Sequence, residues 1–185
     1  MLAQGPDQAP KPGPEHKRLA FLAGDWTAVG HAKASQFGPA GKVIGTEHAE
    51  WLPGGFFLVS RTTENGVMGN SQGLSVSGYN AEEKVYTLHS FNSLGVAQTL
   101  KGAVEGDPWT WAGEYKAGAI SAKTRFIAKE TSPTSYDFKA QIQTSSGAWS
   151  TILEGKAAKR PAPGAHPAGQ YPGAHCVPRH RMSPC

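Results

Sequence analysis

The sequence Ser-Tyr-Asp-Phe-Lys-Ala-Gln-Ile at residues 135–142 shows the clearest structural pattern in the chain. Apolar and polar side chains alternate along it, with Tyr136, Phe138, Ala140 and Ile142 on one face and Asp137, Lys139 and Gln141 on the other. Successive side chains of a β-strand point to opposite faces, so this period of two predicts a strand with one buried and one solvated face. The segment is therefore expected to belong to a sheet that covers a core on one side only.

Further segments of similar length precede and follow this strand, separated by turns rich in Gly, Asn and Pro. They are residues 26–32, 42–51, 56–63, 73–79, 85–91, 97–104, 109–115, 121–129 and 149–155. No helix of crossover length separates them, which disfavours parallel βαβ units. The sequence thus predicts an all-β fold of about ten strands, paired as an antiparallel up-and-down meander. Closure into a barrel would remove the two unpaired edges, and a two-sheet sandwich is the alternative.

Both ends of the chain differ in composition from this body. Residues 1–13, rich in Pro and nearly devoid of apolar side chains, predict a flexible segment. Pro14 and the apolar residues that follow predict a short helix over 14–22. Residues 159–185 contain no acid and many Pro, Gly, Ala and His, which predicts a disordered basic tail. The barrel domain is accordingly expected over residues 14–158.

The net charge of +4 arises from 18 Lys and Arg against 14 Asp and Glu. The excess equals the four basic residues of the tail, Lys159, Arg160, Arg179 and Arg181. The body is therefore neutral and offers no electrostatic reason to expect a nucleic-acid-binding face. Both cysteines, Cys176 and Cys185, also lie in the tail, so the body needs no disulfide.

No apolar run approaches the ~20 residues that a membrane-spanning helix requires. The short opening Met1 to Gln4 fits either an ordinary N-terminus or the remnant of a signal peptide. Localisation therefore stays open between the cytoplasm and export, and the sequence sets no oligomeric state.

Five stretches together resemble a known family. They are residues 16–26 (HKRLAFLAGDW), 50–58 (EWLPGGFFL), 78–86 (GYNAEEKVY), 106–111 (GDPWTW) and 132–138 (SPTSYDF). The first resembles the helix and Gly-x-Trp opening of the lipocalin, or calycin, superfamily. The full set resembles the bacterial lipocalin-like domains catalogued as DUF1579, over roughly residues 14–158. The resemblance implies a lipocalin-like barrel and brings no established activity.

In lipocalins the Trp of that opening closes one end of the barrel beside a basic residue near the last strand. Trp26 matches this Trp and shares its predicted strand face with the small residues Ala28, Gly30 and Ala32. We therefore expect Trp26 to be a buried structural anchor. Lys156 is the first candidate to cover its indole, and Lys159 is the second.

The nitrobindins, another calycin-like group, hold haem through a histidine near the C-terminal strands. This chain has no His between His89 and His166, so it lacks a matching ligand, and no cofactor is expected.

A small apolar or amphipathic ligand inside the barrel is the leading functional hypothesis. The candidate ligand-binding residues are Trp51, Phe57, Arg61, Tyr79, His89, Trp109, Trp111 and Phe138. Trp109 and Trp111 share a strand face and could form one wall with Trp51 and Phe57. Aromatic side chains of this kind also fill ordinary cores, which is the alternative for each of them.

Basic strand residues, namely Arg61, Lys123 and Arg125, could turn inward to hold a ligand carboxylate, although outward positions are more common. The connection from Asn65 to Ser71 could act as a lid over the barrel mouth.

Metal and catalytic signatures are absent from the sequence of the body. The strand histidines His31, His48 and His89 lack metal-ligand spacing, so no metal site is expected. The nearest approach to a nucleophile elbow, around Ser75, lies inside a predicted strand and lacks the strand-to-helix turn. An interaction module with a filled barrel, or a weak enzyme that uses the cavity, are the alternatives to a small-molecule carrier.

Overall fold

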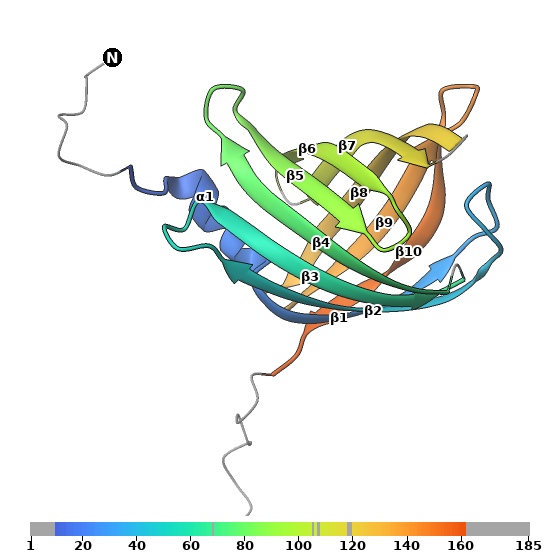
Figure 1. The fold of residues 1–185 in the computed structure, drawn as a ribbon, viewed down its shortest axis with the longest axis horizontal. Helices are drawn as coiled ribbons and strands as arrows, with labels where there is room; N and C mark the ends of the chain where they lie inside the picture. The colour runs from blue at the N-terminus through green and yellow to red at the C-terminus, as the bar shows by residue number, and fades with distance from the viewer. Residues whose placement is uncertain (1–9, 68, 105, 107, 118–119, 162–185) are drawn as a thin grey trace, which may run out of the picture.

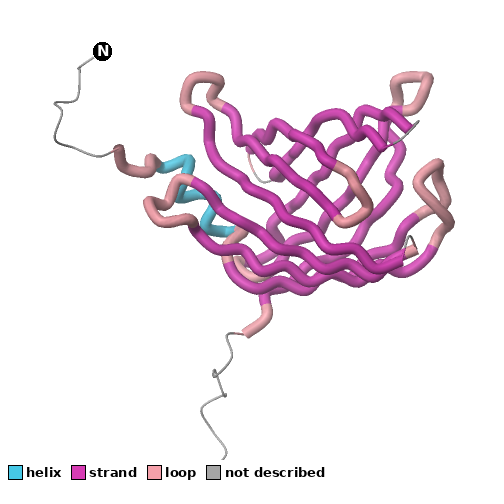
Figure 2. The backbone as a smooth tube through the Cα atoms, in the orientation of Figure 1, coloured by secondary structure: helices cyan, strands magenta, loops and turns pink. Residues whose placement is uncertain are grey.

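The computed structural model describes residues 10–161 except 68, 105, 107, 118 and 119. Ten strands form one closed antiparallel barrel in up-and-down order (Figures 1 and 2). They are β1 Gly24–Ala32, β2 Gly41–Trp51, β3 Phe57–Gly66, β4 Gly69–Asn80, β5 Val85–Asn92, β6 Ala97–Val104, β7 Pro108–Ala117, β8 Ile120–Ser132, β9 Ser135–Gln143 and β10 Trp149–Lys159. The predicted all-β barrel is confirmed, and the sandwich alternative is wrong.

Closure of the barrel depends on small residues where β1 meets β10. In this seam Ala28 pairs with Ala157, and Gly30 pairs with Gly155. A Cβ atom at Gly155 would lie 2.3 Å from the Val29 carbonyl oxygen and 2.7 Å from the Phe138 ring. The first and last strands can therefore approach each other beneath the Phe138 ring only because this position has no side chain.

One end of the barrel is covered by α1 (Pro14–Arg18) and the 3₁₀ turn Leu19–Phe21 (Figure 1). The single helix expected over 14–22 is thus shorter and tightens into a 3₁₀ turn. Leu19 is fully buried. The Tyr86 hydroxyl donates a hydrogen bond to the Glu15 carbonyl at 3.2 Å, and Trp26 Nε1 donates to the Leu22 carbonyl at 2.9 Å. These contacts fasten the helix to the barrel.

Two other expectations need correction. The proposed lid from Asn65 to Ser71 does not exist, because β3 and β4 stay paired through Asn65 with Asn70 and Gly66 with Gly69. This leaves a tight hairpin in place of a long loop. β10 runs through Lys159, one residue beyond the expected end of the domain.

Residues 1–9 of the expected N-terminal segment, and residues 162–185 of the expected tail, lie outside the described residues. Among the described residues, the helices lack the length and hydropathy that a membrane-spanning helix requires.

Candidate functional site

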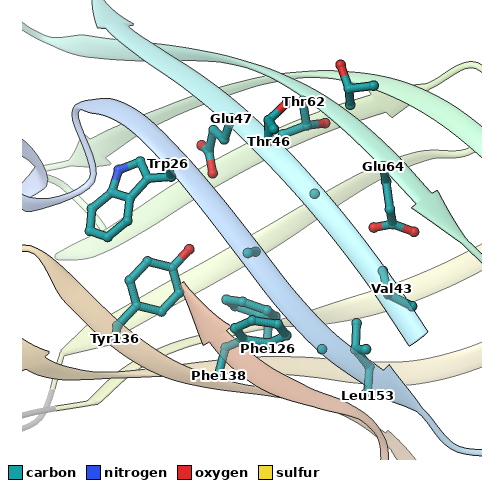
Figure 3. A pocket seen from close by; sticks show the side chains of 14 residues that line it. Trp26, Val43, Thr46, Glu47, Thr62, Glu64, Phe126, Tyr136, Phe138 and Leu153 are labelled. Atoms are coloured by element: carbon teal, nitrogen blue, oxygen red, sulfur yellow. The ribbon is translucent and has the colours of Figure 1, made fainter. Parts of the chain in front are cut away.

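The strand register determines which side chains face the barrel interior. On β1 the inward row is Trp26, Ala28, Gly30 and Ala32, as the sequence predicted, and its direct partners on β2 include Glu47, Gly45 and Val43. A cavity of about 240 Å³ lies against this row (Figure 3). It is lined by Trp26, Ala28, Gly30, Val43, Gly45, Thr46, Glu47, Thr62, Thr63, Glu64, Phe126, Tyr136, Phe138 and Leu153.

Aromatic rings form one wall of this cavity. Phe126 of β8 and Phe138 of β9 are stacked, with ring centres 5.7 Å apart and an angle of 22° between the planes. Tyr136 packs against Trp26 at 5.0 Å. Because Trp26 is buried and Phe21 covers it at 5.5 Å, the cavity is closed at the end that the helix covers. Flat rings in offset contact provide a surface suited to an apolar or aromatic molecule.

Polar groups from β2 and β3 form the facing wall (Figure 3). Glu47 of β2 lies directly opposite Thr62 of β3, and Glu64 lies one inward position further along β3. Burial raises the pKa of the Glu47 carboxyl, and a hydrogen bond from the Ser60 hydroxyl opposes this in part. Desolvation also raises the pKa of Glu64, which is nevertheless exposed and marks the side where the cavity reaches solvent.

Tyr136 places a phenol between the two walls. Burial raises the pKa of this phenol well above its ordinary value, and the nearby Glu47 raises it further. The Tyr136 hydroxyl therefore keeps its proton at every physiological pH and can serve as a hydrogen-bond donor.

A second cavity of about 270 Å³ lies toward β6–β9 and shares Phe126 with the first. Its lining comprises Phe37, Gln98, Leu100, Tyr115, Thr124, Arg125, Phe126, Ala140, Gln141 and Ile152. The register places the Arg125 and Gln141 side chains on the outer face, opposite to Phe126 and Ala140. Arg125 Nε donates to Gln141 Oε1 at 2.7 Å there, so its charge is not turned into the barrel. This second space is accordingly less polar than the first.

Four of the predicted binding residues belong to the packed end of the interior. Trp109 and Trp111 share a face, as expected, and stack with an 8° angle between their planes. They are 0% and 5% exposed. Trp51 and Tyr79 pack against the same core cluster. None of the four lines either interior cavity, and Phe138 alone of the eight candidates lines one. Trp51 instead lines an open pocket beside α1, together with Lys11, Pro12, His16, Lys17, Ala20 and Gly55.

The remaining three candidates lie on the outer face of the barrel, which corrects the expectation that they face the interior. Phe57 is 47% exposed, and its ring covers Gly78 of the neighbouring strand. Arg61 forms an ion pair with Glu50 at 3.1 Å. His89 Nδ1 lies 3.1 Å from the Thr99 hydroxyl on that face. Each of these three side chains contacts a neighbour on the outer face. Each is adjacent in sequence to an inward-facing residue, so strand alternation points it outward.

The basic residue over Trp26 also differs from the first expectation. Lys159 pairs with Trp26 in the register, and its Nζ lies 5.1 Å from the indole centre. Lys156 lies an odd number of positions from Lys159 on the same strand, so its side chain points outward. There it is 83% exposed and its Nζ lies 3.8 Å from an Asp137 carboxylate oxygen. Trp26 is buried as predicted, with 2% exposure, and Lys159 rather than Lys156 covers it.

Several cavity residues were not among the predicted ligand-binding residues, above all Glu47, Thr62, Glu64, Phe126 and Tyr136. The clearest available signal was Tyr136, which shares the alternating face of Phe138. The others could be identified only from their positions relative to Trp26 in the paired strands, and the sequence alone does not give that pairing.

The chain belongs to the family described as protein of unknown function (DUF1579), whose model matches residues 11–159. The crystal structure of Rv2717c from M. tuberculosis is similar in fold, with a TM-score of 0.59 and 12% sequence identity. That match covers 80% of this chain and 99% of that chain. No curated protein matches the sequence.

Proposed function

We propose that this domain is a lipocalin-like binding protein that carries or senses a small amphipathic molecule inside its barrel. One observation carries the proposal: a cavity that is closed at the Trp26 end places stacked aromatic rings opposite a row of polar side chains. Ligand sites typically combine a mainly apolar lining with a few converging polar groups. The two walls match that pattern.

The size of the cavity limits the ligand. An apolar cavity of about 150 Å³ accepts a benzene ring. The first cavity, at about 240 Å³, thus has room for one aromatic ring with a short substituent or for a bicyclic ring. A longer ligand would also have to enter the second cavity past Phe126, which lines both.

Isothermal titration calorimetry with indole, a neutral bicyclic probe, tests this proposal. Gly45→Leu is the blocking variant. Gly45 lines the cavity, and a Cβ atom there would meet its nearest neighbour at 3.6 Å, so the backbone tolerates a side chain that projects into the empty space. His31→Leu is the matched control, because it adds leucine to an exposed outer position of β1.

The expected result is saturable binding of indole to the parent protein and to His31→Leu, and a loss of at least tenfold in Gly45→Leu. Absence of binding to the parent, or equal binding to all three proteins, would contradict a ligand site in this cavity.

A further inference from the structure

The charges that line the first cavity are all of one sign. Among its 14 lining residues are two carboxylates, Glu47 and Glu64, and no Lys, Arg or His. At the closed end Lys159 lies over the Trp26 and Phe21 rings, and no ion pair joins it to either carboxylate. The cavity lining therefore holds two acidic groups and no basic side chain among the described residues.

The interactions of Glu47 compensate only in part for the desolvation of its carboxyl group. Its one side-chain partner is the buried Ser60 hydroxyl, and withdrawal from water disfavours its charged form. A carboxylate that is removed from water without an opposite charge destabilises the protein that contains it. Carboxyl groups that are desolvated in this way at the expense of stability are commonly found at functional sites.

The two carboxyl groups line different ends of the same cavity, with Glu47 toward Trp26 and Glu64 toward Val43 (Figure 3). Glu47 faces Thr62 across the strand pair, and Glu64 faces Gly45, so the acids are diagonal neighbours with the Thr62 side chain beside them. Figure 3 shows both carboxylates projecting from the β2–β3 wall, with the rings of Tyr136, Phe126 and Phe138 on the other side of the cavity. An N–H donor group bound at Glu47 would leave the apolar part of the same molecule against the rings, and Glu64 would add negative charge toward the open side of the cavity.

We propose that the ligand is an organic amine in its ammonium form, with the nitrogen bound by Glu47, with Glu64 adding negative charge toward the open side, and with a single-ring or short aliphatic body against Phe126 and Phe138. This inference rests on the proposed function, since it specifies the ligand of the same cavity. An ammonium group supplies three donors and no acceptor, which matches carboxylate and hydroxyl oxygens. A ligand carboxylate would instead meet two like charges.

Three probes of nearly equal shape distinguish an amine ligand from the more general proposal of a small amphipathic ligand. They are phenethylamine, phenethyl alcohol and hydrocinnamate, which present a cationic, a neutral and an anionic group at neutral pH. Calorimetric titration of the full chain is expected to give the tightest binding for the amine. The advantage over the alcohol should be about tenfold, because a charge-assisted hydrogen bond is roughly twice as strong as a neutral one. Hydrocinnamate should bind most weakly.

Glu47→Gln and Glu64→Gln keep the side-chain shape and remove the charge. Glu47→Gln should abolish most of the preference for the amine, Glu64→Gln should reduce it by a smaller factor, and both should leave the affinity for the alcohol nearly unchanged. Glu50→Gln is the control, because it neutralises an acid of the same strand that points outward to Arg61. That variant should retain the full preference.

Each result is decisive. Equal affinity for amine and alcohol, or a parallel loss of both in Glu47→Gln and Glu64→Gln, would overturn the assignment of an amine while leaving a ligand site in place. If neither these probes nor indole bind, the proposed function itself fails.

Discussion

Replacement of Trp26 by alanine probes the closed end of the barrel. The indole is 2% exposed and contacts Phe21 at 5.5 Å and Tyr136 at 5.0 Å. Its Nε1 also donates to the Leu22 carbonyl, which joins the helical cover to β1. Trp26→Ala would therefore remove core packing and the attachment of the N-terminal cover together.

The magnitude follows from these contacts. Truncation of a buried Trp or Phe to Ala typically costs about 3–5 kcal/mol. Trp26 already faces the cavity on one side, so part of the ring has no packing partner to lose. We therefore expect a loss in the lower half of that range, about 3–4 kcal/mol in the free energy of unfolding.

Two lysine variants provide the comparison. Lys159→Ala removes the ammonium over the indole and should cost about 0.5–1 kcal/mol, because the lysine is partly exposed. Lys156→Ala should change the unfolding free energy by less than about 0.5 kcal/mol, because that side chain is a solvated surface group.

Urea denaturation followed by far-UV circular dichroism measures all three variants beside the parent, without relying on the fluorescence of Trp26. A loss below about 1 kcal/mol in Trp26→Ala would refute the assignment of the indole to a packed core. A larger loss in Lys156→Ala than in Lys159→Ala would refute the register of β10 against β1.

Three further predictions concern other parts of the barrel. Because burial raises the pKa of Glu47 in the folded state, the stability associated with its protonated form is lost as the pH rises. Glu47→Gln should therefore be more stable than the parent in urea at neutral pH, with a smaller difference near pH 4, where the unfolded-state carboxyl is about half protonated. Less stability in the variant at neutral pH would contradict this. Phe57→Ala, Arg61→Ala and His89→Ala should leave the calorimetric affinity for indole within about twofold, because changes away from a site usually have effects within ±0.5 kcal/mol. A larger loss in any of them would place a site on the outer face. Gly155→Ala should lower the thermal midpoint markedly, because its Cβ would collide with the β1 backbone, and an unchanged midpoint would show that the seam is looser than described.

Strand alternation allowed most of the fold to be predicted from the sequence. Tyr136 and Phe138 share an apolar face in an otherwise polar segment, so their strand and its buried side were readable directly. The same held for Trp26, whose small neighbours Ala28 and Gly30 indicated a face with space above it. The succession of such strands without a crossover helix then limited the topology to an antiparallel meander.

The binding residues were harder to predict, because the interior of this barrel is partly polar. On β3 the inward positions include Ser60, Thr62 and Glu64, whereas the apolar Phe57 and Val59 point outward. Hydrophobicity alone therefore assigns the wrong face to that strand. Only the pairing of Glu47 with both Trp26 and Thr62 shows that these polar groups share a cavity with Phe138.

The choice between Lys156 and Lys159 as the residue over Trp26 also depended on strand register. Both lie near the end of the last strand, and both could reach the first strand in a closed barrel. They differ by an odd number of residues, so they point to opposite faces, and the choice between them depends on a register that the sequence does not fix.

The location of a bound probe shows whether a ligand enters the first cavity. Indole can be added to isotope-labelled protein, and intermolecular nuclear Overhauser effects can be measured from its protons. We expect contacts with Phe126, Phe138 and Leu153, which line the first cavity. Contacts confined to the exposed outer residues Leu74 and Phe91 would contradict it, because they would place binding on the outside of the barrel.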